Sequence, residues 1–241
     1  MKINHWNLPY SKEYTQFPKK KIHTISFHGK HNLRYCVIPG KSKKQKIPII
    51  LVQGMGLYIE NWCLDFLKTL DDFTLYLIDP IKADNLKLCA ESIYEITKNI
   101  PKFYFIGYSF GSFVIQEYMT IFPTISIEKV VFLAGGCICS FKLYLNPRNT
   151  TNIEQYDGKL ILNQMLSAMK ARIFQKKCFL HDSFHHNIPF LFVKAEKDHI
   201  FKQDYLFTGK NEIIVKNTDH NFLVTRPIFI AKQIKEFFVS Y

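Results

Sequence analysis

Three residues in this sequence of 241 have types and surroundings suited to nucleophilic catalysis: Ser109, Asp198 and His220. A serine hydroxyl at its free pKa is a poor nucleophile, so it needs a histidine base. The histidine in turn needs a carboxylate that fixes its tautomer and stabilises the imidazolium. The chain order serine, aspartate, histidine differs from that of the two common protease triads. The set predicts attack by Ser109 on an acyl carbon, with His220 as the base and Asp198 as the acid.

The serine lies at the centre of Gly107-Tyr108-Ser109-Phe110-Gly111, directly after the apolar run KFYFI and directly before a segment with helical periodicity that ends at Phe122. A strand–turn–helix context of this kind is typical of a nucleophile turn. The tight turn forces the serine into a strained backbone conformation, and the flanking glycines avoid clashes of a Cβ with the neighbouring strand or helix. We expect the hydroxyl to be exposed at the carboxyl edge of a sheet.

The acid and the base follow the last two predicted strands. Asp198 lies five residues past the run FLFV, and His220 follows the run IIV. Glu196 and Asp219 are rival carboxylates. Asp198 is favoured because the acid characteristically lies several residues past its strand, where it can reach Nδ1 of the histidine. The side chain of Asp219 is expected to point away from His220, because adjacent side chains usually diverge.

An oxyanion needs two converging N–H donors, and one of them comes from the residue after the nucleophile, here Phe110. The second is expected from Met55, where the apolar run that ends at Val52 continues into Gln53-Gly54-Met55-Gly56. Four further residues are predicted to contact the substrate, two beside these turns and two in a later insertion: Gln53, Tyr108, Met165 and Met169.

The elements that must position these residues alternate between strand and helix. Several of the predicted strands are continuous apolar runs, as expected of strands buried on both faces of a parallel sheet. The predicted strands are 47–52, 74–78, 102–106, 129–134, 189–193 and 212–215, and the predicted helices are 86–98, 110–122 and 227–238. An antiparallel hairpin, 22–27 and 33–38, is expected at the sheet edge. The fold class is therefore α/β, with a mostly parallel central sheet and helices on both faces.

The stretch 137–187 contains no convincing buried strand, so it is predicted to be a small helical lid inserted after the sixth strand. Within it, residues 160–174 carry an apolar stripe at helical spacing, which equally suits a helix that packs on the core. The length of the chain favours a single domain, 1–241, that includes this lid.

These segments together resemble the α/β-hydrolase family over nearly the whole chain. The resemblance implies the roles already given to Ser109, Asp198, His220, Met55 and Phe110. The stretches PIILVQGMG, GYSFG and HNFLVTRPIFIAKQIKEFF look most like the intracellular polyhydroxyalkanoate depolymerases and related short-lid esterases. The chain departs from the family in two places. Gln53 stands where the family usually has a histidine, and IDPIKAD (78–84) replaces a glycine-rich turn.

Three functions fit this pattern. The first is hydrolysis of a carboxylic ester with an aliphatic acyl part, without a cofactor. The second is cleavage of an ester or thioester on an acidic acyl carrier protein, as in the similar pimeloyl-carrier methyl-ester esterases of biotin synthesis. This second function is suggested by the net charge of +12 and by basic residues of the predicted lid: Arg148, Lys159, Lys170, Arg172, Lys176 and Lys177. The third is ligand binding by a catalytically inactive hydrolase scaffold.

The positive charge does not favour nucleic acid as the partner. Of the 32 basic residues only four are arginine, the residue preferred for bidentate recognition of bases and phosphates. The lysines at 19–21 and 41–46 could steer an acidic partner or anionic lipid, although a solvated surface explains them more simply.

Other site types have weaker signals. His181 and His185 have i, i+4 spacing, but no carboxylate or cysteine at metal-like spacing completes a metal site, and the six cysteines form no CxxC pair. No apolar run approaches the roughly 20 residues of a membrane span, and no secretory signal is visible. A cytoplasmic protein is expected.

Overall fold

The computed structural model describes most of the predicted α/β core. The residues that it describes are 22–29, 31–54, 59, 62–79, 86–135, 188–198 and 211–240. The predicted lid, 137–187, lies outside these ranges. Within them, no helix is both long and apolar enough to cross a bilayer.

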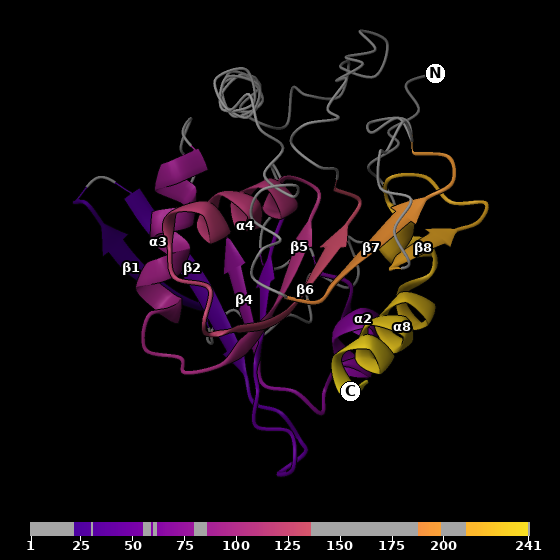
Figure 1. Ribbon diagram of the computed structural model, residues 1–241, viewed down its shortest axis with the longest axis horizontal. Coiled ribbons are helices and arrows are strands. Elements are labelled where there is room, and N and C mark those ends of the chain that lie inside the picture. The colour runs from indigo at the N-terminus through magenta and orange to yellow at the C-terminus, as the bar shows by residue number, and fades with distance from the viewer. Residues whose placement is uncertain are drawn as a thin grey trace, which may run out of the picture.

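The core is an eight-stranded sheet with the order β1-β2-β4-β3-β5-β6-β7-β8 (Figure 1). Its strands are β1 (Ile22–Phe27), β2 (His31–Ile38), β3 (Ile49–Val52), β4 (Leu75–Asp79), β5 (Phe103–Tyr108), β6 (Ile127–Leu133), β7 (Phe190–Ala195) and β8 (Glu212–Val215). β1 pairs with β2, and β2 with β4, in antiparallel fashion. All other pairs are parallel, so the carboxyl ends of β3 to β8 lie at one edge of the sheet.

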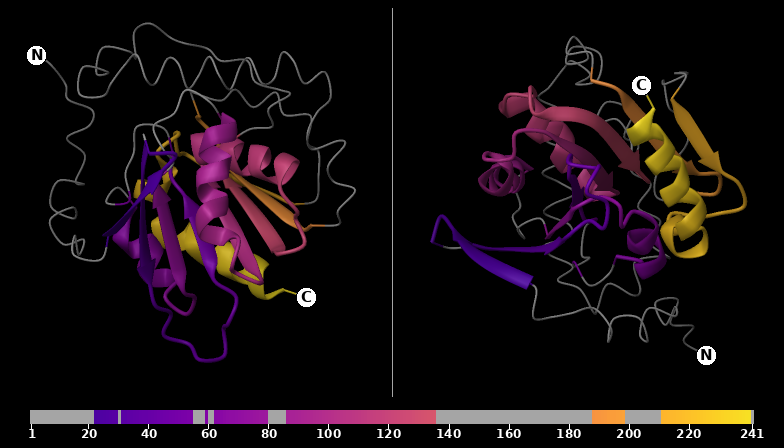
Figure 2. Two further views of the ribbon diagram at one scale, coloured as in Figure 1. Left: turned by 90° about the vertical axis from the view of Figure 1, so that its left-hand side faces the viewer. Right: turned by 90° about the horizontal axis from the view of Figure 1, so that it is seen from below.

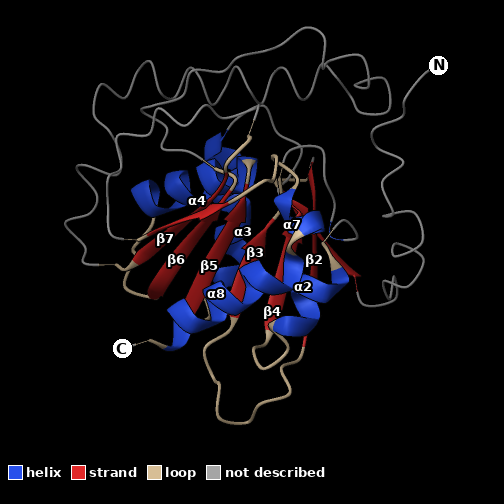
Figure 3. Cartoon of the chain, turned by 90° about the vertical axis from the view of Figure 1, so that its right-hand side faces the viewer, coloured by secondary structure: helices blue, strands red, loops and turns tan. Residues whose placement is uncertain are grey.

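Helices cover both faces of this sheet, as the sequence predicts. The helices are α2 (Leu64–Thr69), α3 (Leu86–Thr97), α4 (Phe110–Ile121), α7 (Phe222–Thr225) and α8 (Pro227–Val239). α3 and α4 lie on one face, and α2 and α8 lie on the other (Figures 2 and 3).

The continuous apolar runs form strands that are buried on both faces. In β5, Phe103 and Phe105 belong to the core on the side of α3 and α4, whereas Tyr104 and Ile106 belong to the core on the side of α2 and α8. Successive side chains of a strand point to opposite faces, so each face needs its own apolar set. This double burial confirms the predicted parallel sheet.

Differences from the sequence prediction concern the ends and the shortest elements. The hairpin ladder continues to the Phe27–His31 pair, so β2 begins two residues earlier than predicted. Positive φ values of 51° at His28 and 64° at Gly29 make this tighter turn. α2 and α7 were not predicted, because six and four residues are too few to establish a helical period.

Candidate active site

The turn between β5 and α4 holds Ser109 in a strained conformation. Its φ of 51° and ψ of −115° lie outside the regions that residues with a side chain normally adopt. Two hydrogen bonds fix this geometry. The Ser109 N–H donates to the Leu133 carbonyl at 2.7 Å, and the Ser109 carbonyl accepts from the Ser112 N–H at 3.0 Å. The surrounding structure therefore holds the serine at the carboxyl edge of the sheet.

Close packing explains why a glycine follows the serine two residues later. A methyl group added at Gly111 would lie 2.2 Å from the carbonyl oxygen of Val52, at the end of β3. No side chain can be accommodated at that distance unless α4 moves away from β3. Gly111 thus allows the first turn of α4 to rest on the end of the neighbouring strand, which is the close approach that the sequence pattern predicts.

His220 lies between the serine and a carboxylate. Its Nε2 is 3.0 Å from Ser109 Oγ, and its Nδ1 is 2.8 Å from Asp198 Oδ2. The side chains of His220 and Asp198 are only 8% and 5% exposed. When Nδ1 carries the proton, it donates to the carboxylate, and the unprotonated Nε2 can accept the proton of the serine hydroxyl. We call Ser109, His220 and Asp198 the hydrogen-bonded array.

The two rival carboxylates have other partners. Glu196 is exposed, and its Oε2 accepts the backbone N–H of Asn217 at 2.8 Å. Asp219 is also exposed, and its Oδ1 accepts the backbone N–H of Asn221 at 2.9 Å. Of the three carboxylates considered, the structure brings Asp198 to the imidazole ring.

Backbone hydrogen bonds join the loops that carry Asp198 and His220. The N–H of Glu196 donates to the carbonyl of Val215 at 3.1 Å, and the N–H of Lys197 donates to the carbonyl of Thr218 at 2.8 Å. These bonds extend the pairing of β7 and β8 beyond the strand ends. The positions of Asp198 and His220 therefore depend on each other.

The loop after β3 passes directly beside the serine. A methyl group at Gly54 would lie 3.3 Å from Ser109 Cβ. Gln53 is buried, and its Oε1 accepts the N–H of Gly54 at 3.0 Å. Because the Gly54 N–H already donates to Gln53, an oxyanion donor from this loop would have to come from a residue after Gly54. The predicted donor, Met55, lies outside the described residues.

Comparisons with known proteins agree on the fold. No protein-family model and no curated protein matches the sequence. Among solved structures, carboxylesterase CesB from Bacillus subtilis has a TM-score of 0.67 at 13% identity, over 95% of each chain. An α/β-hydrolase fold protein from Chitinophaga pinensis has a TM-score of 0.68 at 17% identity, over 91% of this chain and 98% of that one. A lipase-esterase related protein from Clostridium acetobutylicum has a TM-score of 0.62 at 19% identity, over 90% and 99%.

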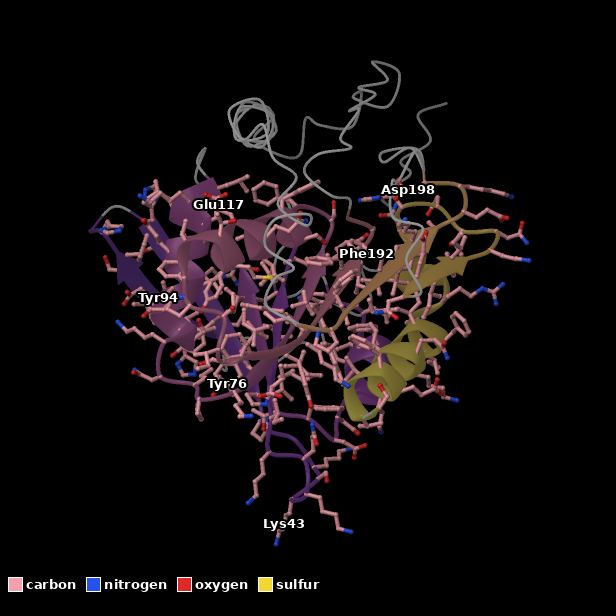
Figure 4. The ribbon with its side chains drawn as sticks, in the orientation of Figure 1. Lys43, Tyr76, Tyr94, Glu117, Phe192 and Asp198 are labelled. Atoms are coloured by element: carbon pink, nitrogen blue, oxygen red, sulfur yellow. The ribbon has the colours of Figure 1, made fainter. Side chains whose placement is uncertain are left out.

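This chain has the α/β-hydrolase fold. In open α/β sheets, ligands bind outside the carboxyl ends of the strands, and the hydrogen-bonded array lies at that edge. Asp198 is at this end of the molecule, whereas Lys43, in the lysine-rich loop 41–46, is at the opposite end (Figure 4). The narrower resemblance to polyhydroxyalkanoate depolymerases stays a prediction.

Tyr108 has a contact in this α/β-hydrolase fold that the sequence did not reveal. Its side chain is buried, and its hydroxyl donates to the backbone carbonyl of His220 at 3.0 Å. The predicted contact of Tyr108 with substrate stays a prediction. No local signal could identify a partner 112 residues away.

The other predicted site residues are placed as follows. Phe110 is the first residue of α4, where backbone N–H groups have no partner within the helix, so its N–H is suited to be an oxyanion donor. Met165, Met169 and the histidines at 181 and 185 lie outside the described residues. Among the residues that the structure describes, no three His, Cys, Asp or Glu side chains are grouped as metal ligands.

Proposed function

We propose that this protein is a serine hydrolase that cleaves a carboxylic ester with an aliphatic acyl part through an acyl-enzyme intermediate. The observation that carries the proposal is the hydrogen-bonded array, in which one imidazole lies 3.0 Å from a serine hydroxyl and 2.8 Å from a buried carboxylate. The strained φ of Ser109 supports it, because such strain is retained where function requires it.

In the first half-reaction, Ser109 Oγ attacks the acyl carbon while His220 Nε2 takes the hydroxyl proton. Asp198 stabilises the resulting imidazolium and does not itself take the proton. The tetrahedral oxyanion accepts hydrogen bonds from the N–H of Phe110 and, as we propose, of Met55. When the intermediate collapses, the ester C–O bond breaks and the alcohol leaves with the proton from His220.

In the second half-reaction, water takes the place of the serine hydroxyl. His220 removes a proton from the water as it attacks the acyl-enzyme, and returns that proton to Ser109 Oγ when the carboxylic acid leaves. The positive end of the α4 dipole favours the negative charge that develops beside it in both halves.

We further propose that the chain is one domain in which lid residues such as Met165 and Met169 line the acyl site. The carrier-protein alternative is based on basic residues between 148 and 177, so it remains an outcome of the substrate test below. An inactive scaffold that binds a ligand is the non-enzymatic alternative.

A fluorophosphonate probe tests the chemistry directly, because an activated serine attacks phosphorus as it attacks an acyl carbon. We expect covalent labelling of the wild-type protein and none of Ser109→Ala. Circular dichroism of both proteins controls for folding. A folded wild-type protein that stays unlabelled would contradict the enzymatic proposal and favour the ligand-binding scaffold.

The substrate class needs a separate measurement. A chain-length series of p-nitrophenyl esters, assayed beside acyl-CoA and acyl-carrier substrates, compares kcat/KM across the alternatives. We expect activity on the small esters. Activity confined to the acyl-carrier substrate, and lost at high ionic strength, would support the carrier alternative.

A further inference from the structure

We infer that Tyr108 is a positioning residue that holds the backbone of His220 at the correct distance from Ser109. The inference depends on the proposed function and deepens it. Tyr108 directly precedes the nucleophile along the chain, and its hydroxyl donates to the carbonyl of the base at 3.0 Å. One side chain therefore links two parts of the hydrogen-bonded array that lie 111 residues apart in sequence.

The packing around Tyr108 leaves its ring little freedom. The side chain is 5% exposed, and its ring stacks beside the imidazole of His220 with centroids 5.9 Å apart and an angle of 30° between the planes. Phe222 packs edge-on against it with ring centroids 6.5 Å apart, and the ring of Trp62 lies tilted to it at 6.3 Å. The hydroxyl is thus held at the His220 carbonyl by packing as well as by the hydrogen bond.

This contact is suited to control geometry because it holds a part of His220 that Asp198 does not. Asp198 orients the ring through Nδ1, whereas Tyr108 fixes the main chain from which the ring extends. Tyr108 is also the last residue of β5, so the base is positioned from the same strand that leads into Ser109. A misplacement of about 1 Å between reacting groups can lower a rate by roughly a hundredfold.

The same strand provides a matched control in Tyr104. Its hydroxyl also donates to a backbone carbonyl, that of Phe238, at 3.3 Å, and its ring stacks on Phe238 with centroids 4.4 Å apart. Tyr104 is 6% exposed, and it lies on the same face of β5 four residues earlier. The two tyrosines differ in what they hold: Tyr104 holds the end of α8, and Tyr108 holds the base.

The test compares Tyr108→Phe with Tyr104→Phe, each of which removes one hydroxyl. We expect Tyr108→Phe to lower both kcat for a p-nitrophenyl ester and the rate constant of fluorophosphonate labelling by about tenfold, with KM within about twofold of wild type. Tyr104→Phe should leave all three within about twofold of wild type. Thermal unfolding of both variants measures how much of each effect is loss of stability.

Specific outcomes would overturn the inference. A rise in KM with unchanged kcat in Tyr108→Phe would mean that the tyrosine binds substrate. Equal rate losses in the two variants would mean that both hydroxyls act only by stabilising the fold. If the wild-type protein is not labelled at all, the proposed function fails first, and the inference is withdrawn with it.

A second pair of variants keeps the test decisive if Tyr108→Phe does not fold. Replacement of Tyr108 by p-aminophenylalanine keeps a donor at the same place on the ring, whereas p-methylphenylalanine keeps the volume without a donor. We expect the amino variant to approach the wild-type labelling rate and the methyl variant to remain about tenfold slower. Equal rates in this pair would also overturn the inference.

Discussion

The β5–α4 turn and the paired loops after β7 and β8 hold the two sides of the hydrogen-bonded array in different ways. The turn places Ser109 through a continuous stretch of chain, from the strand that precedes it to the helix that follows. The loops place Asp198 and His220 through hydrogen bonds between separate segments. Ser109 therefore depends mainly on the backbone geometry of one turn, whereas Asp198 and His220 depend on how two loops meet.

The two regions should also differ in the kind of substitution that disrupts them. At the turn the controlling contacts are steric, as at Gly111, where any side chain meets the end of β3. In the loops they are polar, and Asp198 and Glu196 lie two residues apart with different partners. Substitutions in the two regions should therefore separate steric from polar control.

Asp198→Asn should lower kcat by about four orders of magnitude, because an amide no longer fixes the imidazole tautomer that the base needs. Glu196→Gln is the matched control, since it makes the same chemical change two residues away on the same loop. It should keep most of the activity. Steady-state kinetics on one p-nitrophenyl ester measures both variants, and equal losses would contradict the assignment of Asp198 as the acid.

Gly111→Ala should lower the free energy of unfolding by about 3 kcal/mol, because its Cβ would lie 2.2 Å from the Val52 carbonyl oxygen and force α4 away from β3. Gly29→Ala is the control. Gly29 has a φ of 64°, and apart from its chain neighbours no atom of the described residues lies within 4 Å of an added Cβ, so only backbone strain of about 1 kcal/mol is expected. Urea unfolding measures both, and a smaller effect at Gly111 would weaken the steric account of the turn.

Glu196→Ala should lower kcat by roughly threefold to tenfold, because it removes the acceptor of the Asn217 N–H and loosens the loop that leads to His220. Glu196→Gln keeps an acceptor oxygen and should be close to wild type. Asn217 has a φ of 58°, so its conformation depends on such contacts. If alanine and glutamine behave alike, the Glu196 contact does not help to position the base.

The smallest change in stability is expected within the strands that lead to these loops. There Lys194 of β7 forms an ion pair with Glu212 of β8, with 2.7 Å between Nζ and Oε1. Burial lowers the pKa of the Lys194 ammonium below its ordinary value, and the hydrogen bond to Glu212 opposes this only in part. Replacing a buried ion pair by uncharged residues is often neutral. Lys194→Met combined with Glu212→Gln should stay within about 1 kcal/mol of wild type at pH 7.

The sign of the pH dependence follows from the lowered pKa. In the folded protein Lys194 releases its proton at a lower pH than in the unfolded chain. The cost of burying the charge is therefore present at neutral pH and is relieved as the pH rises through the folded pKa towards the unfolded value. Wild type should gain stability relative to the double variant between pH 7 and pH 10 in urea unfolding, and a relative loss would contradict this.

The sheet and the turn that carries Ser109 follow from local patterns in the sequence. Strands buried on both faces require apolar side chains on both sides, so β3 and β5 appear as continuous apolar runs. The turn at Ser109 is marked by five consecutive residues, and it is completed by the contact of Gly111 with the end of β3 and by the hydrogen bond of the Ser109 N–H to Leu133. The helices α2 and α7 were not predicted, because their few residues are ordered by packing and not by a periodic pattern.

The sequence favours Asp198 as the partner of His220, and the structure brings that carboxylate to the imidazole. The partner of the Tyr108 hydroxyl, in contrast, is visible only in the tertiary structure. Glu196 lies one residue and Asp198 three residues past the end of β7, and both side chains are carboxylates. The pairing of β7 with β8 and the bonds between their loops bring Asp198 to the ring and Glu196 to the Asn217 N–H. Residue types show which groups can react. The distances between those groups depend on contacts between segments that are remote in the chain, and a local sequence pattern does not contain that information.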